Sequence, residues 1–130
     1  MPKRDERDAV QDMAEACARI TAYAAGLSYE SFVRDTKTQD AIVRNLEIIG
    51  EAAKNLTPAF KAQHDTIDWT SITRMRDKLI HHYFGINVEI VWDIVQHNIP
   101  RLREQLNDLA GVISLHSGGR ATARPNGISR

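Results

Sequence analysis

The sequence predicts an all-α protein, an up-and-down bundle of four to five helices. Apolar residues recur three and four positions apart along most of the chain, which is the spacing of one face of an α-helix. No segment shows sustained alternation of apolar and polar residues, so no β-strand is expected. The 130 residues include only 6% aromatics, seven glycines and four prolines, a composition that favours helices over a turn-rich sandwich.

The first two helices are expected over residues 4–25 and 29–35. Gly26 suits the position just past the end of the first helix, and Ser28 can cap the second. The apolar face of the first helix consists of Val10, Met13, Cys17, Ile20, Ala24 and Leu27.

A third helix is expected to start at Thr36 or Thr38 and to reach about Leu56. Thr57-Pro58 then marks a break, with the proline at the start of a further helical turn. The apolar face of the third helix consists of Ile42, Leu46, Ile49, Ala53 and Leu56.

A fourth helix is expected over residues 69–84, with Asp68 as its cap and Gly85 at its end. Asn87 is placed to cap the last helix, which the apolar pattern extends over residues 88–115. Pro100 should kink or divide this last helix, because it lacks a backbone donor and crowds the preceding turn.

The domain is predicted to span residues 1–116, followed by a flexible tail over residues 117–130. The tail loses all apolar periodicity. The charged amino terminus does not resemble a signal peptide, and no stretch approaches the ~20 apolar residues of a membrane span. The single Cys17 falls on an apolar face and is expected to be an inert buried thiol. We therefore expect a cytoplasmic protein that does not contact a membrane.

The charges balance, with 17 basic and 17 acidic residues. Proteins that coat nucleic acid through bulk electrostatics are normally basic. If this protein handles RNA, it is therefore expected to do so through a local site.

Residues 74–83, RMRDKLIHHY, form the segment with the strongest chemical signal. They contain three fixed cations, two imidazoles and one carboxylate. Histidine can take a proton from a ribose 2′-hydroxyl, and arginine can grip a phosphate and stabilise charge that grows on phosphorus. Arg76 and His81 are thus candidates for a metal-independent cleavage of RNA, in which the substrate supplies its own nucleophile. The alternative interpretation is a solvated helix face with an incidental histidine pair.

Helix geometry constrains this pair. Arg76 and His81 are about 140° apart around an ideal helix and do not share one face. Either the helix ends near His81 and the imidazole swings round, or a second protomer completes the site.

No metal site and no cofactor are predicted. His81 and His82 are adjacent and diverge by about 100° on a helix, which makes a poor chelating pair. His64, His97 and His116 show no ligand spacing, and the sequence has no second cysteine and no glycine-rich phosphate loop.

The spacing of Arg76, His81 and Tyr83 resembles the Rx4HxY signature of the HEPN superfamily, and specifically that of HepT toxins of bacterial toxin–antitoxin pairs. The bare spacing is common, but the flanking residues make the resemblance specific. It extends from about Arg4 to Leu109 and includes TQDAIVRNLEIIGEAAKNL, Trp69 and YFGINVEIVWDIV.

The resemblance implies a homodimeric helical bundle with both motifs facing a composite cleft. It implies an RNase that needs no metal and leaves cyclic-phosphate ends. It also implies a partner, a nucleotidyltransferase antitoxin of MntA type, which silences the toxin by transferring AMP to the motif tyrosine, here Tyr83.

The resemblance also assigns roles to single residues. Arg76 would be the phosphate clamp and His81 the general base, with Asp77 orienting the arginine. His82 would be a second base or merely exposed, and we expect it to be exposed. Gly50-Glu51 resembles a family feature on the third helix, where Glu51 would approach the cleft or Gly50 would serve helix packing.

Two alternatives remain open. One is a catalytically silent HEPN module that binds nucleotides or a partner, and the other is a plain interaction bundle. The class of RNA that would be cleaved is not predicted by any motif in the sequence.

Overall fold

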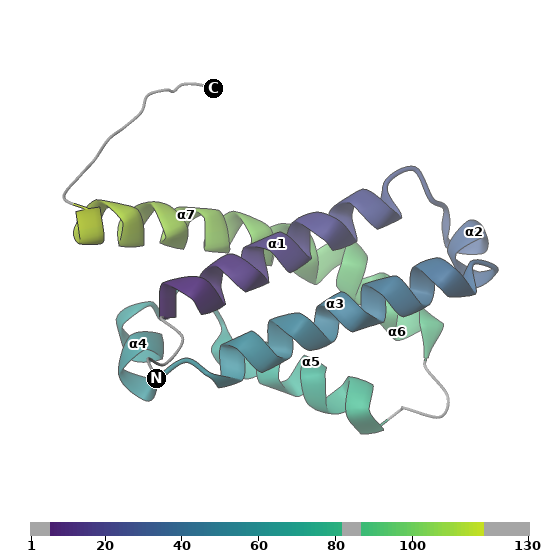
Figure 1. The fold of residues 1–130 in the computed structure, drawn as a ribbon. Coiled ribbons are helices and arrows are strands. Elements are labelled where there is room, and N and C mark those ends of the chain that lie inside the picture. Colours follow the sequence, from purple (N-terminus) through teal and green to yellow (C-terminus); the bar gives the residue numbers. More distant parts are fainter. Residues whose placement is uncertain (1–5, 82–86, 119–130) are drawn as a thin grey trace.

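The computed structural model describes residues 6–81 and 87–118 of the chain. These residues form an all-helical fold, and none of them lies in a β-strand (Figure 1). The prediction of an all-α protein is therefore confirmed. The elements are α1 (Glu6–Ala24), α2 (Tyr29–Val33), α3 (Thr36–Lys54), α4 (Pro58–Gln63), α5 (Trp69–His81), α6 (Val88–Asp93), the π-helical segment η1 (Ile94–Asn98) and α7 (Ile99–Gly118).

Four long elements make the bundle: α1, α3, α5 and the continuous run of α6, η1 and α7. Helix α1 packs against α3 and α7, and α3 also packs against α5. Figure 1 shows α1 and α3 running in opposite directions, joined at one end by the short helix α2. The described residues thus add two short helices, α2 and α4, to the four long elements.

Side-chain caps fix the ends of the helices. Ser28, Thr57 and Asn87 each accept a hydrogen bond from the backbone N–H three residues ahead, as the sequence predicts for Ser28 and Asn87. Gly26 follows the last turn of α1 with φ +77°, a left-handed conformation that favours glycine. These caps satisfy backbone donors that a helix end leaves open.

The start of α3 differs in one detail from the expectation. Thr36 is the first helical residue, but the cap is Asp35, which accepts hydrogen bonds from the Thr38 backbone N–H at 3.0 Å and from its hydroxyl at 2.6 Å. These hydrogen bonds lower the pKa of Asp35. Because Asp35 caps α3, the second helix ends at Val33 and not at residue 35.

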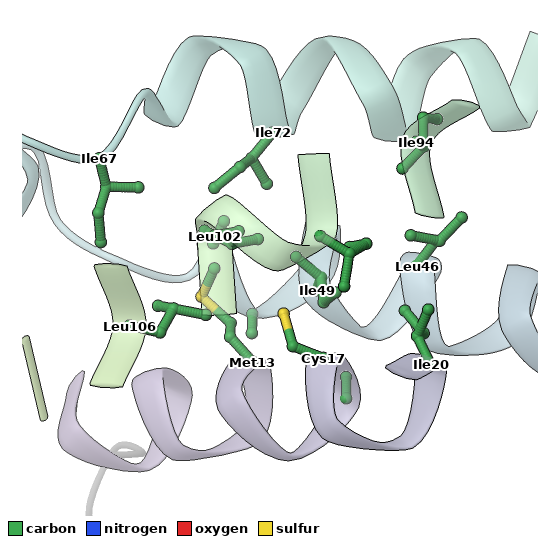
Figure 2. Close-up of a cluster of buried hydrophobic side chains, with 14 of the residues drawn as sticks. Met13, Cys17, Ile20, Leu46, Ile49, Ile67, Ile72, Ile94, Leu102 and Leu106 are labelled. Atoms are coloured by element: carbon green, nitrogen blue, oxygen red, sulfur yellow. The ribbon is translucent and has the colours of Figure 1, made fainter. Parts of the chain in front are cut away.

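The core lies between α1, α3, α5 and α7. Figure 2 shows Cys17 and Ile20 of α1 pointing toward Ile49 and Leu46 of α3, and Met13 of α1 extending toward Leu102 and Leu106 of α7. Cys17 is fully buried, and this desolvation raises the pKa of its thiol to about 12. The predicted apolar faces of the first and third helices form this core, with Ala24 and Leu27 at its half-buried edge.

The last predicted helix is interrupted before Pro100 by a π-helical segment, within a run that stays helical from Val88 to Gly118. The backbone N–H of Ile99 bonds to the carbonyl of Ile94, five residues earlier, and this wider turn ends η1. Pro100 follows as the second residue of α7 and cannot donate the next backbone hydrogen bond of this run. The sequence predicts the interruption but not its π-helical form.

Helix α7 continues to Gly118, two residues into the segment predicted as a tail. Residues 119–130 lie outside the described residues, and the boundary at residue 116 stays a prediction. None of the helices in the described ranges is both long and apolar enough to cross a membrane.

Candidate active site

The arginine of the motif lies on the side of α5 that faces α3. Nε of Arg76 donates to Oε2 of Glu51 at 2.9 Å, and Nη2 lies 2.7 Å from the same oxygen. These charge-assisted contacts hold one edge of the planar guanidinium. The structure therefore brings together two of the residues that the sequence singles out, from helices far apart in the chain.

Asp77 is the second carboxylate near this guanidinium. Its Oδ1 lies 3.6 Å from Nη1 of Arg76, which is an ion-pair distance longer than a hydrogen bond. The Arg76 side chain is 21% exposed, whereas those of Glu51 and Asp77 are 57% and 54% exposed. The arginine is thus the sheltered member of a three-residue charged cluster.

Gly50 explains how Arg76 comes so close to α3. A Cβ atom at position 50 would lie 2.7 Å from Cβ of Arg76 and 2.9 Å from its Cγ and Cδ. Any other residue would push α5 away from α3 or displace the arginine. Of the two interpretations of the Gly50-Glu51 pair, the structure shows helix packing for Gly50 and contact with Arg76 for Glu51.

The pairing changes the titration of Glu51. The hydrogen bond and the positive charge of Arg76 lower the pKa of the Glu51 carboxyl, and Lys54 lowers it further. Glu51 is therefore charged at neutral pH, where its negative charge accompanies the guanidinium of Arg76.

His81 is the last residue of α5, so the backbone is helical up to this histidine. On an ideal helix Arg76 and His81 therefore remain about 140° apart. The side chain of His81 is not described, and His82, Tyr83 and Gly85 lie outside the described residues. Their predicted roles stay predictions.

A groove on another side of α5 was not predicted by the sequence. It has a volume of about 590 Å³ and lies between α5 and the run from α6 to α7. Arg74 lines one wall and Arg101 lines the opposite wall. No sequence motif joins these residues, because the groove forms only when the helices pack.

The described residues contain no group of three or more His, Cys, Asp or Glu side chains that could hold a metal ion. The cluster around Arg76 offers two carboxylates, and both of them contact the arginine. Its chemistry is therefore that of a positioned cation. Such a cation can bind a phosphate or stabilise negative charge that grows on it.

A family model described as ribonuclease HepT-like matches residues 13–109. This range includes α3, α5 and both members of the Arg76–Glu51 pair. The chain belongs to the HepT-like ribonuclease family, and the resemblance drawn from the motif is confirmed.

Individual relatives agree with the family match. A protein of Thermococcus cleftensis, named as a probable ribonuclease HepT, is 45% identical over 107 residues, which are 82% of this chain and 97% of the relative. A protein of Methanocaldococcus jannaschii, named provisionally as an RNase, is 43% identical over 115 residues, 85% of this chain and 95% of the relative. No solved structure gives a significant match.

Proposed function

We propose that this protein is a metal-independent endoribonuclease and the toxin of a toxin–antitoxin pair. The observation that carries the proposal is the Arg76–Glu51 contact. In a chain of the HepT-like ribonuclease family, the arginine of the Rx4HxY motif is held at 2.7–2.9 Å by a carboxylate of another helix.

A held guanidinium suits catalysis on a phosphate. Glu51 occupies the edge formed by Nε and Nη2, which leaves Nη1 as the amino group that Glu51 does not bind; Nη1 lies 3.6 Å from Oδ1 of Asp77, longer than a hydrogen bond. Because the side chain is already oriented, little conformational entropy is lost when a phosphate binds. Arg76 is thereby suited to stabilise the charge that grows on phosphorus during attack.

In the proposed reaction His81 takes the proton of the ribose 2′-hydroxyl as general base. The 2′-oxygen attacks the adjacent phosphorus, and the bond from phosphorus to the 5′-oxygen breaks. A second catalytic group, acting as general acid, protonates the leaving 5′-oxygen. The products are a 2′,3′-cyclic phosphate and a 5′-hydroxyl, so that neither a metal nor a covalent enzyme intermediate is needed.

We propose a homodimer with a composite cleft as the active form. The support is geometric, because α5 is helical through His81, and an ideal helix places positions 76 and 81 about 140° apart around its axis. Two copies of α5 facing each other would place the arginine of one protomer near the histidine of its partner. The His81 of that partner is then the candidate acid.

The proposed control of this activity is covalent. An MntA-like nucleotidyltransferase antitoxin would transfer AMP from ATP to the hydroxyl of Tyr83, with release of pyrophosphate. The added phosphate would bring negative charge and bulk to the cleft and exclude RNA. His82 beside it is proposed to be exposed.

Cleavage of total RNA in EDTA tests the enzymatic proposal. We expect the wild type to cleave, and Arg76→Ala and His81→Ala to lose activity. Arg44→Ala is the matched control, because Arg44 is exposed and pairs with Glu47 at 3.9 Å, outside the cluster around Arg76. Absence of cleavage by the wild type, or equal cleavage by all variants, would favour the catalytically silent HEPN module.

The intact mass of the protein after co-expression with an MntA-like nucleotidyltransferase tests the proposed inactivation by AMP transfer. We expect the wild type to gain AMP units and Tyr83→Phe to gain none. A gain that persists in Tyr83→Phe would remove Tyr83 as the acceptor.

A further inference from the structure

The groove between α5 and the run from α6 to α7 has the form of a ligand site. Its volume of about 590 Å³ lies within the range of small-ligand pockets, roughly 300–1,000 Å³. Apolar side chains from both walls line it, among them Ile72 and Met75 of α5 and Ile94 and Leu102 of the opposite wall. Such a lining offers a planar, weakly polar group a place to pack.

Cations stand on both walls of this groove. Arg74 and Lys78, one turn apart, line the wall formed by α5, and Arg101 lines the wall formed by α7. Within the described ranges, Arg74 and Arg101 take part in no hydrogen bond or ion pair. Two guanidinium groups from different helices are thus available to one ligand.

Two of the three acidic residues that line the groove bind other groups of the protein. Asp68 caps α5, with Oδ1 accepting from the Ser71 backbone and Oδ2 from its hydroxyl, both at 3.0 Å. Asp93 holds Nδ1 of His97 at 2.9 Å. Glu89 lies in the first turn of α6, where a negative charge stabilises the helix. Arg74 acts on Asp68 only through its charge, which helps to lower the pKa of that carboxyl without an ion-pair contact.

We propose that this groove binds a nucleotide unit of the RNA strand next to the cleaved phosphate, with its backbone phosphate between Arg74 and Arg101 and its base on the apolar lining. The proposal rests on the function proposed above and deepens it. It names a second contact for the RNA, outside the Arg76–His81 motif.

The position of the groove along α5 supports this assignment. Arg74 precedes His81 by seven residues, which on an ideal helix is about 10.5 Å along the axis and about 20° around it. Arg74 is therefore nearly aligned with His81, whereas Arg76 is not. A strand that reaches His81 can continue along the same side of α5 toward the groove.

Binding of an uncleavable RNA tests the groove separately from catalysis. The probe is a fluorescein-labelled, single-stranded 2′-O-methyl oligoribonucleotide of about twelve nucleotides, which lacks the attacking hydroxyl. Fluorescence anisotropy would compare the wild type with Arg74→Gln/Arg101→Gln. The control, Arg34→Gln/Arg103→Gln, removes the same charge from exposed residues outside the groove.

We expect the groove variant to bind the probe at least about tenfold more weakly than the control variant, since each charge-assisted hydrogen bond to a phosphate is strong. The slope of log affinity against log salt should also fall by about 0.7 for each phosphate that the variant no longer binds. Circular dichroism would verify that both variants retain their helices.

Equal affinities of the groove and control variants would overturn the proposal, even if the wild type cleaves RNA. Conversely, a wild type that binds the probe through the groove but cleaves no RNA would leave the groove assigned and remove the catalytic proposal. A separate titration with AMP distinguishes the source of the nucleotide. Saturable AMP binding that needs Arg74 and Arg101, without any loss of RNA affinity in the variant, would overturn the assignment to RNA.

Discussion

Gly50 lies against the aliphatic stem of Arg76, so that a Cβ on the glycine would come within 2.7 Å of the arginine Cβ. The contact joins α3 to α5 at the residue that we propose as the phosphate clamp. The distance between the two helices and the position of the guanidinium are therefore set by the same missing methyl group.

The first prediction concerns Gly50→Ala. The added methyl group should separate α3 from α5, and we expect the free energy of unfolding to fall by about 1–2 kcal/mol, after the roughly 1 kcal/mol that alanine gains over glycine in a helix. RNA cleavage should fall further than stability explains, because Arg76 is displaced. Urea denaturation and cleavage rates measure the two effects.

Gly111→Ala is the matched control for this prediction. A Cβ at position 111 on α7 would meet nothing within 4 Å. We expect this variant to gain up to about 1 kcal/mol of stability from helix propensity and to cleave RNA normally. A Gly50→Ala variant as stable as Gly111→Ala would show that α3 and α5 tolerate the methyl group.

The second prediction concerns Glu51→Gln. Glutamine keeps the size of the side chain but removes the charge that holds Nε and Nη2 of Arg76. We expect kcat for RNA cleavage to fall while KM changes little, since a loosened arginine still attracts phosphate. Glu47→Gln is the control, because Glu47 lies on the same helix as Glu51 but pairs with Arg44 at 3.9 Å and not with Arg76. A kcat equal to that of Glu47→Gln would remove the positioning role of Glu51.

The third prediction concerns the contribution of Asp68 to the stability of the protein at acidic pH. Hydrogen bonds from Ser71 lower the pKa of Asp68 below its ordinary 3.8. The charged Asp68 carboxyl therefore adds to the free energy of unfolding above pH 3.8, and this contribution is lost as pH falls through the lowered pKa. Asp68→Asn keeps an oxygen that can cap α5 but removes the charge.

Chemical denaturation as a function of pH checks this prediction. The difference in stability between the wild type and Asp68→Asn should be constant near neutrality and should shrink at acidic pH. A difference that stays constant down to the lowest pH would show that the charge of Asp68 adds nothing to its cap.

The fourth prediction concerns Cys17. Burial raises the pKa of its thiol to about 12 from 9.0, so the folded protein should react with a thiol reagent only as fast as it unfolds. Because the folded pKa is raised, the stabilising contribution of the neutral thiol is lost as pH rises above 9. Cys17→Ala has no thiol to ionise, so its stability should not show this decrease above pH 9. Rapid labelling of the native protein at neutral pH would contradict the prediction.

Much of the fold follows from local sequence signals. The apolar spacing locates the helices, and Gly26, Ser28 and Asn87 mark ends that the structure confirms. The sequence does not single out Asp35 as a cap, because Thr36 and Thr38 just after it offer equally good starts for a helix. Local signals locate an end to within a residue or two but do not choose between adjacent capping side chains.

The contacts that build the candidate site are harder to predict from local sequence signals. Spacing and residue chemistry single out Arg76, but its contact with Glu51 spans 25 residues of sequence. The pairing of Arg74 with Arg101 across the groove depends likewise on how α5 packs beside α7. Helix periodicity says which face of a helix is buried, not which partner covers it.

The π-helical turn before Pro100 has a consequence for the length of the chain. Val91 and Ile99 are both buried, although eight residues of an unbroken α-helix would place them about 80° apart. The wider turn absorbs one surplus residue and keeps both on the core side. Deletion of exposed Gln96 would leave seven residues and an offset of only about 20°, so an ordinary helix could replace the π turn. Homologous chains can therefore differ by one residue at this point and still share one core. The change in thermal stability on deletion of Gln96 would measure the cost of such a difference.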